Sequence, residues 1–145
     1  MEAMYFMEKY YIESFEEMNA SEKGDKYRHA LTWLSNVDET ESKMAIIFNQ
    51  KNNAEAFFVQ WLGLSNDDFN NIWEKRAVRV GGQIVQIKTT RTIDEENFTK
   101  VILIWPVINS IKKFFDTNIN KILVFPYMNN EKEYVEENSG VMISL

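Results

Sequence analysis

Two short apolar runs in the last third of the chain constrain the fold more than any other feature. They are VILIW at 101–105 and KILVF at 121–125, and their length suits strands better than helices. A strand without polar alternation is buried on both faces, which is typical of parallel sheets covered by helices. The segment 107–115 between them has the apolar spacing of a helix. We therefore predict a parallel strand pair joined by a right-handed helical crossover.

A pair of glycines in the middle of the chain predicts a different strand arrangement. Gly81 and Gly82 can supply the positive φ angles of a two-residue hairpin turn, with Val80 opposite Gln83. This hairpin is antiparallel, whereas the C-terminal third is expected to be parallel. The chain of 145 residues is therefore predicted to form one Rossmann-like α/β domain over residues 1–145. Its mixed sheet is expected to lie in the middle of three layers.

Apolar spacing and turn residues predict the remaining elements. A first helix is expected over residues 2–19, with an apolar surface so wide that it is either deeply buried or shared with a partner. Gly24 is expected to end it, and a second helix buries Tyr27 and Leu34. The other expected elements are a strand at 43–48, a helix at 54–62 ended by Gly63, a helix capped by Ser65, a helix from Asn129 through Asn138 capped by Asn129, and a strand at 141–145.

The composition excludes several classes of chemistry. The chain has no cysteine, which rules out disulfides and thiol catalysis, and its single histidine, His29, rules out multi-histidine metal sites. Its five glycines form neither a dinucleotide-binding nor a P-loop pattern. The formal net charge of −6 disfavours nucleic acid as a partner. We therefore assign no metal site, no cofactor and no catalytic residue.

One short motif on the hairpin could suggest a nuclease. Gln86-Ile87-Lys88 shares only its lysine with the acid-x-Lys signature of restriction-type nucleases, because Gln86 replaces the acid. The preceding strand offers Arg79 where such a site needs a second carboxylate. We therefore interpret this motif as part of an exposed strand face and not as a nuclease site.

No segment of the sequence predicts membrane insertion or secretion. The longest apolar run is interrupted by Pro106 and is far shorter than the roughly 20 residues of a membrane span. Glu2 and Glu8 stand where a secretory signal would carry basic residues. We expect an acidic, soluble, cytoplasmic protein with no membrane partner.

The predicted topology points to one edge of the sheet as the binding site. Ligands of open α/β sheets bind beyond the carboxyl ends of parallel strands. Three such ends carry aromatic or amide side chains that can stack on and hydrogen-bond a planar ligand. These candidate ligand-binding residues are Asn49 and Gln50, Trp105 and Asn109, and Tyr127 and Asn129. The alternative is that Trp105 and Tyr127 only cap the core while the asparagines form turns.

Three functions remain open at this stage. The leading hypothesis is a non-catalytic binding domain that recognises a partner protein or a small planar ligand. The first alternative is an enzyme that uses carboxylate and amide groups on a nucleotide-like small molecule. The second is a structural homo-oligomer that associates through its first helix. The four tryptophans of the chain favour an interaction surface of some kind, because Trp is common at binding hot spots.

Overall fold

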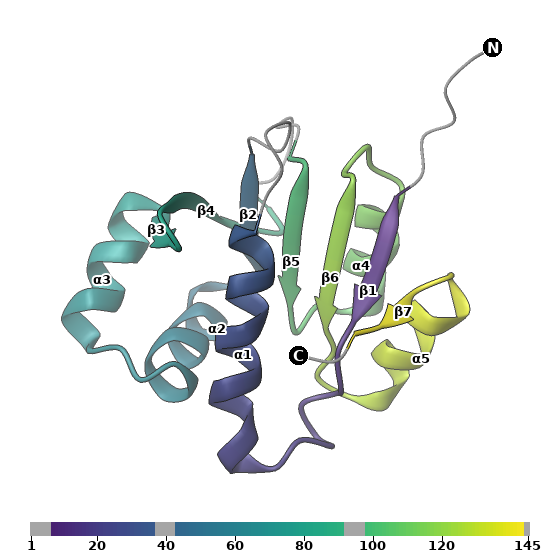
Figure 1. Cartoon of the computed structure of the whole chain (residues 1–145), viewed down its shortest axis with the longest axis horizontal. Helices are drawn as coiled ribbons and strands as arrows, with labels where there is room; N and C mark the ends of the chain where they lie inside the picture. Colours follow the sequence, from purple (N-terminus) through teal and green to yellow (C-terminus); the bar gives the residue numbers. More distant parts are fainter. Residues whose placement is uncertain (1–6, 37–42, 92–97, 144–145) are drawn as a thin grey trace.

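A sheet of seven strands runs through the computed structural model, which describes residues 7–36, 43–91 and 98–143 (Figure 1). The strand order is β3-β4-β2-β5-β6-β1-β7. The strands are β1 (Glu8–Tyr11), β2 (Met44–Phe48), β3 (Ala77–Val80), β4 (Gln83–Thr89), β5 (Lys100–Ile104), β6 (Lys121–Phe125) and β7 (Val141–Met142). Only β3 is antiparallel to its neighbour, and every other adjacent pair is parallel. The predicted mixed α/β sheet is confirmed.

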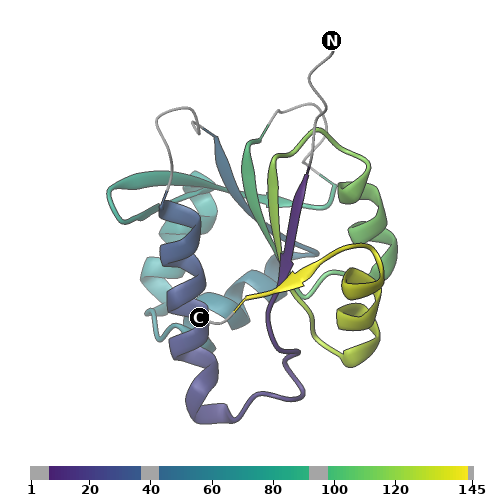
Figure 2. The same cartoon turned by 45° about the vertical axis from the view of Figure 1, so that its right-hand side comes forward.

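Helices cover both faces of this sheet, which gives three layers (Figure 2). One face carries α1 (Ala20–Ser35), α2 (Lys51–Glu55), the π-helix η1 (Ala56–Trp61) and α3 (Asn66–Lys75). The other face carries α4 (Ile108–Phe115) and α5 (Asn129–Glu137). The helix predicted at 54–62 corresponds to α2 and η1 together, and it begins earlier than predicted, at Lys51. Each helical layer packs its own apolar cluster against the sheet.

The β5–β6 pair lies at the centre of the sheet, as its apolar sequence predicts. The two strands pair in parallel, from Lys100 opposite Lys121 to Ile104 opposite Phe125. Successive side chains pack against opposite helical layers. Ile102 packs on the α1 side of the sheet and Leu103 on the α4 side. Because both faces are covered, no position from 101 to 104 can be polar without a buried partner.

The glycine hairpin has the predicted register. Gly81 and Gly82 have φ angles of +54° and +81°, which suit a two-residue turn. Val80 pairs with Gln83, and Val85 is buried on the α1 side. The same alternation turns Ile84 outward.

The predicted first helix is wrong for the residues that the structure describes. Glu8–Tyr11 forms β1, between β6 and β7, and residues 12–19 connect it to α1, while residues 2–6 lie outside the described part. Tyr11 packs with the α4 side of the sheet and Tyr10 with the α1 side. The wide apolar surface therefore belongs to the two faces of a strand. Pairing with distant strands overrides the local helical spacing.

Gly24 does not end a helix but lies inside α1, which is also a correction. A side chain at this position would place its Cβ only 2.8 Å from the backbone oxygen of Trp61. The glycine therefore allows α1 to pack closely against η1. α1 corresponds to the predicted second helix, and it ends near Asn36. The Asn36 carbonyl accepts a hydrogen bond of 2.8 Å from the buried Lys100 Nζ.

We predict that Gly24→Ala destabilises the protein. In an exposed helix, this change stabilises by about 1 kcal/mol. Here the added methyl group meets a backbone carbonyl, so we expect a loss of about 1–3 kcal/mol in the free energy of unfolding. Chemical denaturation measures the difference, and His29→Ala on the exposed side of α1 is the control, with a change within about 0.5 kcal/mol. A gain in stability for Gly24→Ala would contradict the close approach of α1 and η1.

Candidate functional site

The carboxyl ends of the parallel strands share one edge of the sheet, at the bottom of Figure 1. The chain leaves β2 toward α2 on one face and leaves β5 toward α4 on the other. It likewise leaves β6 toward α5 and β1 toward α1, on opposite faces. Adjacent strands whose connections diverge in this way open a crevice where α/β proteins bind ligands. Two such places therefore flank the β5–β6 pair.

A cavity of about 390 Å³ lies at this edge, and we call it the aromatic pocket. Four segments that are distant in sequence contribute to it: the β1–α1 connection, the α2–η1 helix, the end of β5 and the end of β6. Its lining combines ring faces with amide groups. The lining residues are Phe15, Trp61, Trp105 and Tyr127, with Asn52, Asn53, Gln60 and Ala56.

The rings of the aromatic pocket hold one another in place. Tyr127 stacks on Phe15, with 4.6 Å between ring centroids and 9° between planes. Trp105 meets both rings edge to face, at 5.6 Å from Phe15 and 5.8 Å from Tyr127. Trp105 is 8% exposed, whereas Tyr127 is 44% exposed. The pocket thus has a fixed aromatic wall and one accessible ring at its mouth.

Trp105 has an unusual backbone conformation for a bulky residue. Its φ angle is +47°, in the left-handed region that costs on the order of 1–3 kcal/mol for a residue other than glycine. Three hydrogen bonds hold it there. Its N–H donates to the Phe125 oxygen at 2.9 Å, its oxygen accepts from Asn49 Nδ2 at 2.8 Å, and its Nε1–H donates to the Tyr27 hydroxyl at 3.1 Å. The surrounding structure therefore fixes this turn at the end of β5.

One amide of the aromatic pocket has an unsatisfied acceptor. Asn53 Oδ1 is buried and has no hydrogen-bond partner among the described residues. Such an atom costs about 1–3 kcal/mol unless a donor reaches it. The other buried atom of this kind, Glu131 Oε2, lies on α5 outside the pocket lining. Asn53 is therefore a lining residue of the aromatic pocket whose acceptor atom lacks a partner in the described residues.

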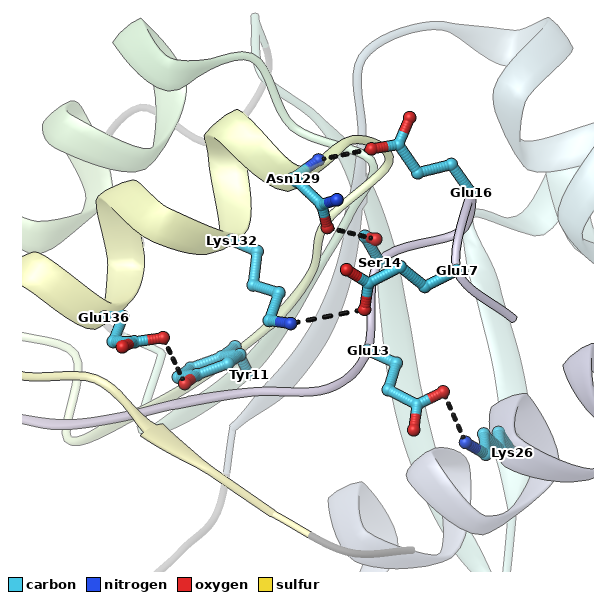
Figure 3. A network of polar contacts seen from close by, with 9 residues as sticks. All are labelled: Tyr11, Glu13, Ser14, Glu16, Glu17, Lys26, Asn129, Lys132 and Glu136. Carbon is cyan, nitrogen blue, oxygen red and sulfur yellow. Dashed lines mark hydrogen bonds and ion pairs between the residues drawn. The ribbon is translucent and has the colours of Figure 1, made fainter.

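A polar network fixes the β1–α1 connection that carries Phe15 (Figure 3). Ser14 Oγ donates to Asn129 Oδ1 at 2.9 Å, and the Asn129 backbone N–H donates to Glu16 Oε1 at 2.9 Å. Glu17 forms an ion pair with Lys132 at 3.2 Å. The Glu16 carboxylate, not the predicted Asn129 side chain, thus receives the first free N–H of α5.

Two backbone hydrogen bonds continue this attachment into the aromatic pocket. The Phe15 N–H donates to the Pro126 oxygen at 2.8 Å, and the Glu16 N–H donates to the Tyr127 oxygen at 3.1 Å. The chain on either side of Phe15 is therefore tied to the segment that carries Tyr127. The stack of the two rings follows from this pairing.

The structure brings only some of the predicted site residues together. Trp105 and Tyr127 line the aromatic pocket. Asn49 and Gln50 line a second cavity of about 440 Å³ with Thr89, Thr90 and Arg91, which we call the polar pocket. Asn129 belongs to the network of Figure 3, and Asn109 is exposed on α4 outside the lining of both pockets.

Sequence reasoning missed six of the eight lining residues of the aromatic pocket, among them Phe15, Trp61 and Asn53. Phe15 lies in the span 2–19 predicted as the first helix, and Trp61 lies in the helix predicted at 54–62, so neither belongs to a predicted strand end. Asn53 lies four residues beyond Asn49 in the connection after β2, so the rule that selected Asn49 also reaches Asn53. No local signal distinguishes Phe15, because its position depends on β1 pairing with β6.

Comparisons of the chain with protein-family models, with curated proteins and with solved structures found no match. Among the described residues, no group of three or more His, Asp or Glu side chains is placed to hold a metal ion. No helix in that part of the chain has the length and apolar character needed to cross a membrane. The function is therefore argued from the geometry of the two pockets.

The Tyr27 hydroxyl predicts a pH dependence of stability. Burial raises its pKa far above the usual value near 10, and the hydrogen bond from Trp105 lowers it by less. In the unfolded chain Tyr27 ionises near pH 10, while in the folded protein it stays neutral. The contribution of Tyr27 to the free energy of unfolding is therefore complete below about pH 10, and it is lost as the pH rises further.

We expect Tyr27→Phe to lose stability less steeply than the unchanged protein between pH 9 and 11. Near pH 7, the variant should be less stable by about 1–3 kcal/mol, because the buried Trp105 Nε1–H loses its acceptor. Urea denaturation across this pH range measures both effects. Parallel pH profiles for the two proteins would contradict this account of Tyr27.

Proposed function

We propose that this protein is a non-catalytic binding domain that holds a small planar ligand in the aromatic pocket. The observation that carries the proposal is a cavity with four aromatic side chains in its lining, where the lining residue Asn53 has a buried Oδ1 without a hydrogen-bond partner in the described residues. Ring faces bind planar molecules by stacking, and a buried acceptor selects those that carry a donor in the right place.

The lining indicates the chemistry of the ligand. Asn53 Oδ1 accepts hydrogen bonds only, so the ligand presents an N–H or O–H group to it. The described lining residues of this pocket include no carboxylate, ammonium or guanidinium group, which favours an uncharged ring. The volume of about 390 Å³ lies within the range of small-molecule sites. A nitrogen heterocycle with a ring or exocyclic N–H meets these conditions.

The surroundings of the aromatic pocket favour binding over catalysis. An enzyme that uses carboxylates needs them within reach of the substrate. The three carboxylates on the β1–α1 connection are all engaged: Glu13 with Lys26, Glu16 with the start of α5, and Glu17 with Lys132. Their positions stabilise Phe15 and do not supply an acid–base pair to the lining.

A partner protein is the second candidate, and exposed apolar side chains favour it. Tyr127, Met128 and Val107 are 44%, 49% and 54% exposed and follow the ends of β6 and β5. Apolar side chains grouped near a sheet edge can form the centre of an interface. A partner of this kind would cover the mouth of the aromatic pocket.

The proposal predicts that Asn53→Leu separates binding from stability. The change removes an unpaired buried acceptor and keeps the side-chain shape, so the free energy of unfolding should stay equal or rise. Binding of the heterocycle should weaken by about tenfold or more, because the ligand donor loses its partner. Thermal shift and tryptophan fluorescence with adenosine, guanosine, cytidine, uridine, nicotinamide and riboflavin measure both quantities.

Two further variants complete this experiment. Tyr127→Ala should weaken the same ligand by about tenfold, through lost stacking of about 1–3 kcal/mol. Asn109→Leu makes the same substitution outside both pockets and should leave binding unchanged. If none of the six compounds changes the melting temperature while a protein copurifies, the partner-protein function replaces the proposed one.

A further inference from the structure

The polar pocket has a lining unlike that of the aromatic pocket. It lies at the carboxyl ends of β2 and β4, which are neighbours in the sheet with Phe48 opposite Thr89. Two amide side chains, two hydroxyls and one guanidinium group surround about 440 Å³. The described lining holds no carboxylate. Every side chain in it can donate a hydrogen bond, so the lining suits an anion with several acceptor oxygens.

Arg91 gives this pocket its charge. It forms no ion pair with the carboxylates of the described residues, whereas Lys26, Arg28 and Lys132 all do. A guanidinium group stays protonated and binds phosphate through two parallel hydrogen bonds. The chain as a whole carries a formal charge of −6, so its overall field repels anions. Any affinity for phosphate at this place therefore comes from the lining itself.

The two pockets share one turn of the chain. Asn49 and Gln50 line the polar pocket, and Asn52 and Asn53 line the aromatic pocket. Lys51 is the only residue between these two pairs along the chain, and α2 begins there. Asn49 Nδ2 also donates to the Trp105 oxygen, which ties the polar pocket to the aromatic wall.

We propose that the polar pocket binds a phosphate group carried by the same ligand that stacks in the aromatic pocket. This inference rests on the proposed function and narrows it to a nucleoside monophosphate or a closely similar molecule. The heterocycle lies against Trp105 and Tyr127, its donor reaches Asn53 Oδ1, and a sugar-sized linker carries the phosphate toward Arg91 and the threonines. No bond is made or broken.

The test compares the affinity of the full chain for each nucleoside with its affinity for the corresponding 5′-monophosphate. The nucleosides are those of adenine, guanine, cytosine and uracil, and inorganic phosphate is tested alone. Isothermal calorimetry should show the preferred monophosphate binding about tenfold or more tightly than its nucleoside. Arg91→Gln should bring this ratio close to one and leave nucleoside binding unchanged. Arg79→Gln makes the same substitution on β3, beside the hairpin turn, and should keep the full ratio.

The outcomes separate this inference from the proposed function. Equal affinities for nucleoside and monophosphate, or a ratio that survives Arg91→Gln, overturn the phosphate site and leave the aromatic pocket as a binding site. Stabilisation by inorganic phosphate alone, with no response to any nucleoside or monophosphate, overturns the shared ligand. If none of the nine compounds binds, the inference is overturned, whereas the proposed function is overturned only if nicotinamide and riboflavin also fail to bind.

Discussion

β5 and β6 lie side by side in a single parallel register, and the aromatic pocket depends on this pairing. Each strand sends alternate residues into the two apolar clusters, so the helices on both faces pack onto the same few side chains. Since the strands point the same way, the chain leaves both at one edge. The hydrogen bond from the Trp105 N–H to the Phe125 oxygen extends the pairing by one residue. That extension brings the Trp105 and Tyr127 rings to 5.8 Å.

The Asn49 side chain connects the two pockets of this edge. The crevice between β2 and β5 is where the connections diverge to opposite faces. Asn49 Nδ2 bridges it by donating to the Trp105 oxygen. Asn49 lines the polar pocket and Trp105 lines the aromatic pocket, so this hydrogen bond joins the two linings. The same hydrogen bond helps to hold Trp105 at its positive φ angle.

The sequence predicts those parts of the fold whose signal is local. β2, β5 and β6 are buried on both faces, so their apolar runs identify them without any knowledge of their neighbours. β1 has only four residues, and it is a strand because β6 and β7 lie beside it. The apolar spacing of this segment also matches a helix, so pairing with distant strands determines that it forms a strand. Trp105 and Tyr127 were predictable from strand ends, whereas Phe15 requires the position of β1.

The unfavourable features of the structure are concentrated at the aromatic pocket. The positive φ angles of Arg76 and Ser139 follow the ends of helices, where such conformations are common, but that of Trp105 follows a strand. The buried Lys23 places its Nζ 3.7 Å from the Phe15 ring centroid, where the cation–π contact offsets part of the cost of burying its charge. Asn53 Oδ1 is unpaired in the same place. Proteins retain such local costs where binding offsets them, and the core formed by β5 and β6 supplies the stability that makes them tolerable.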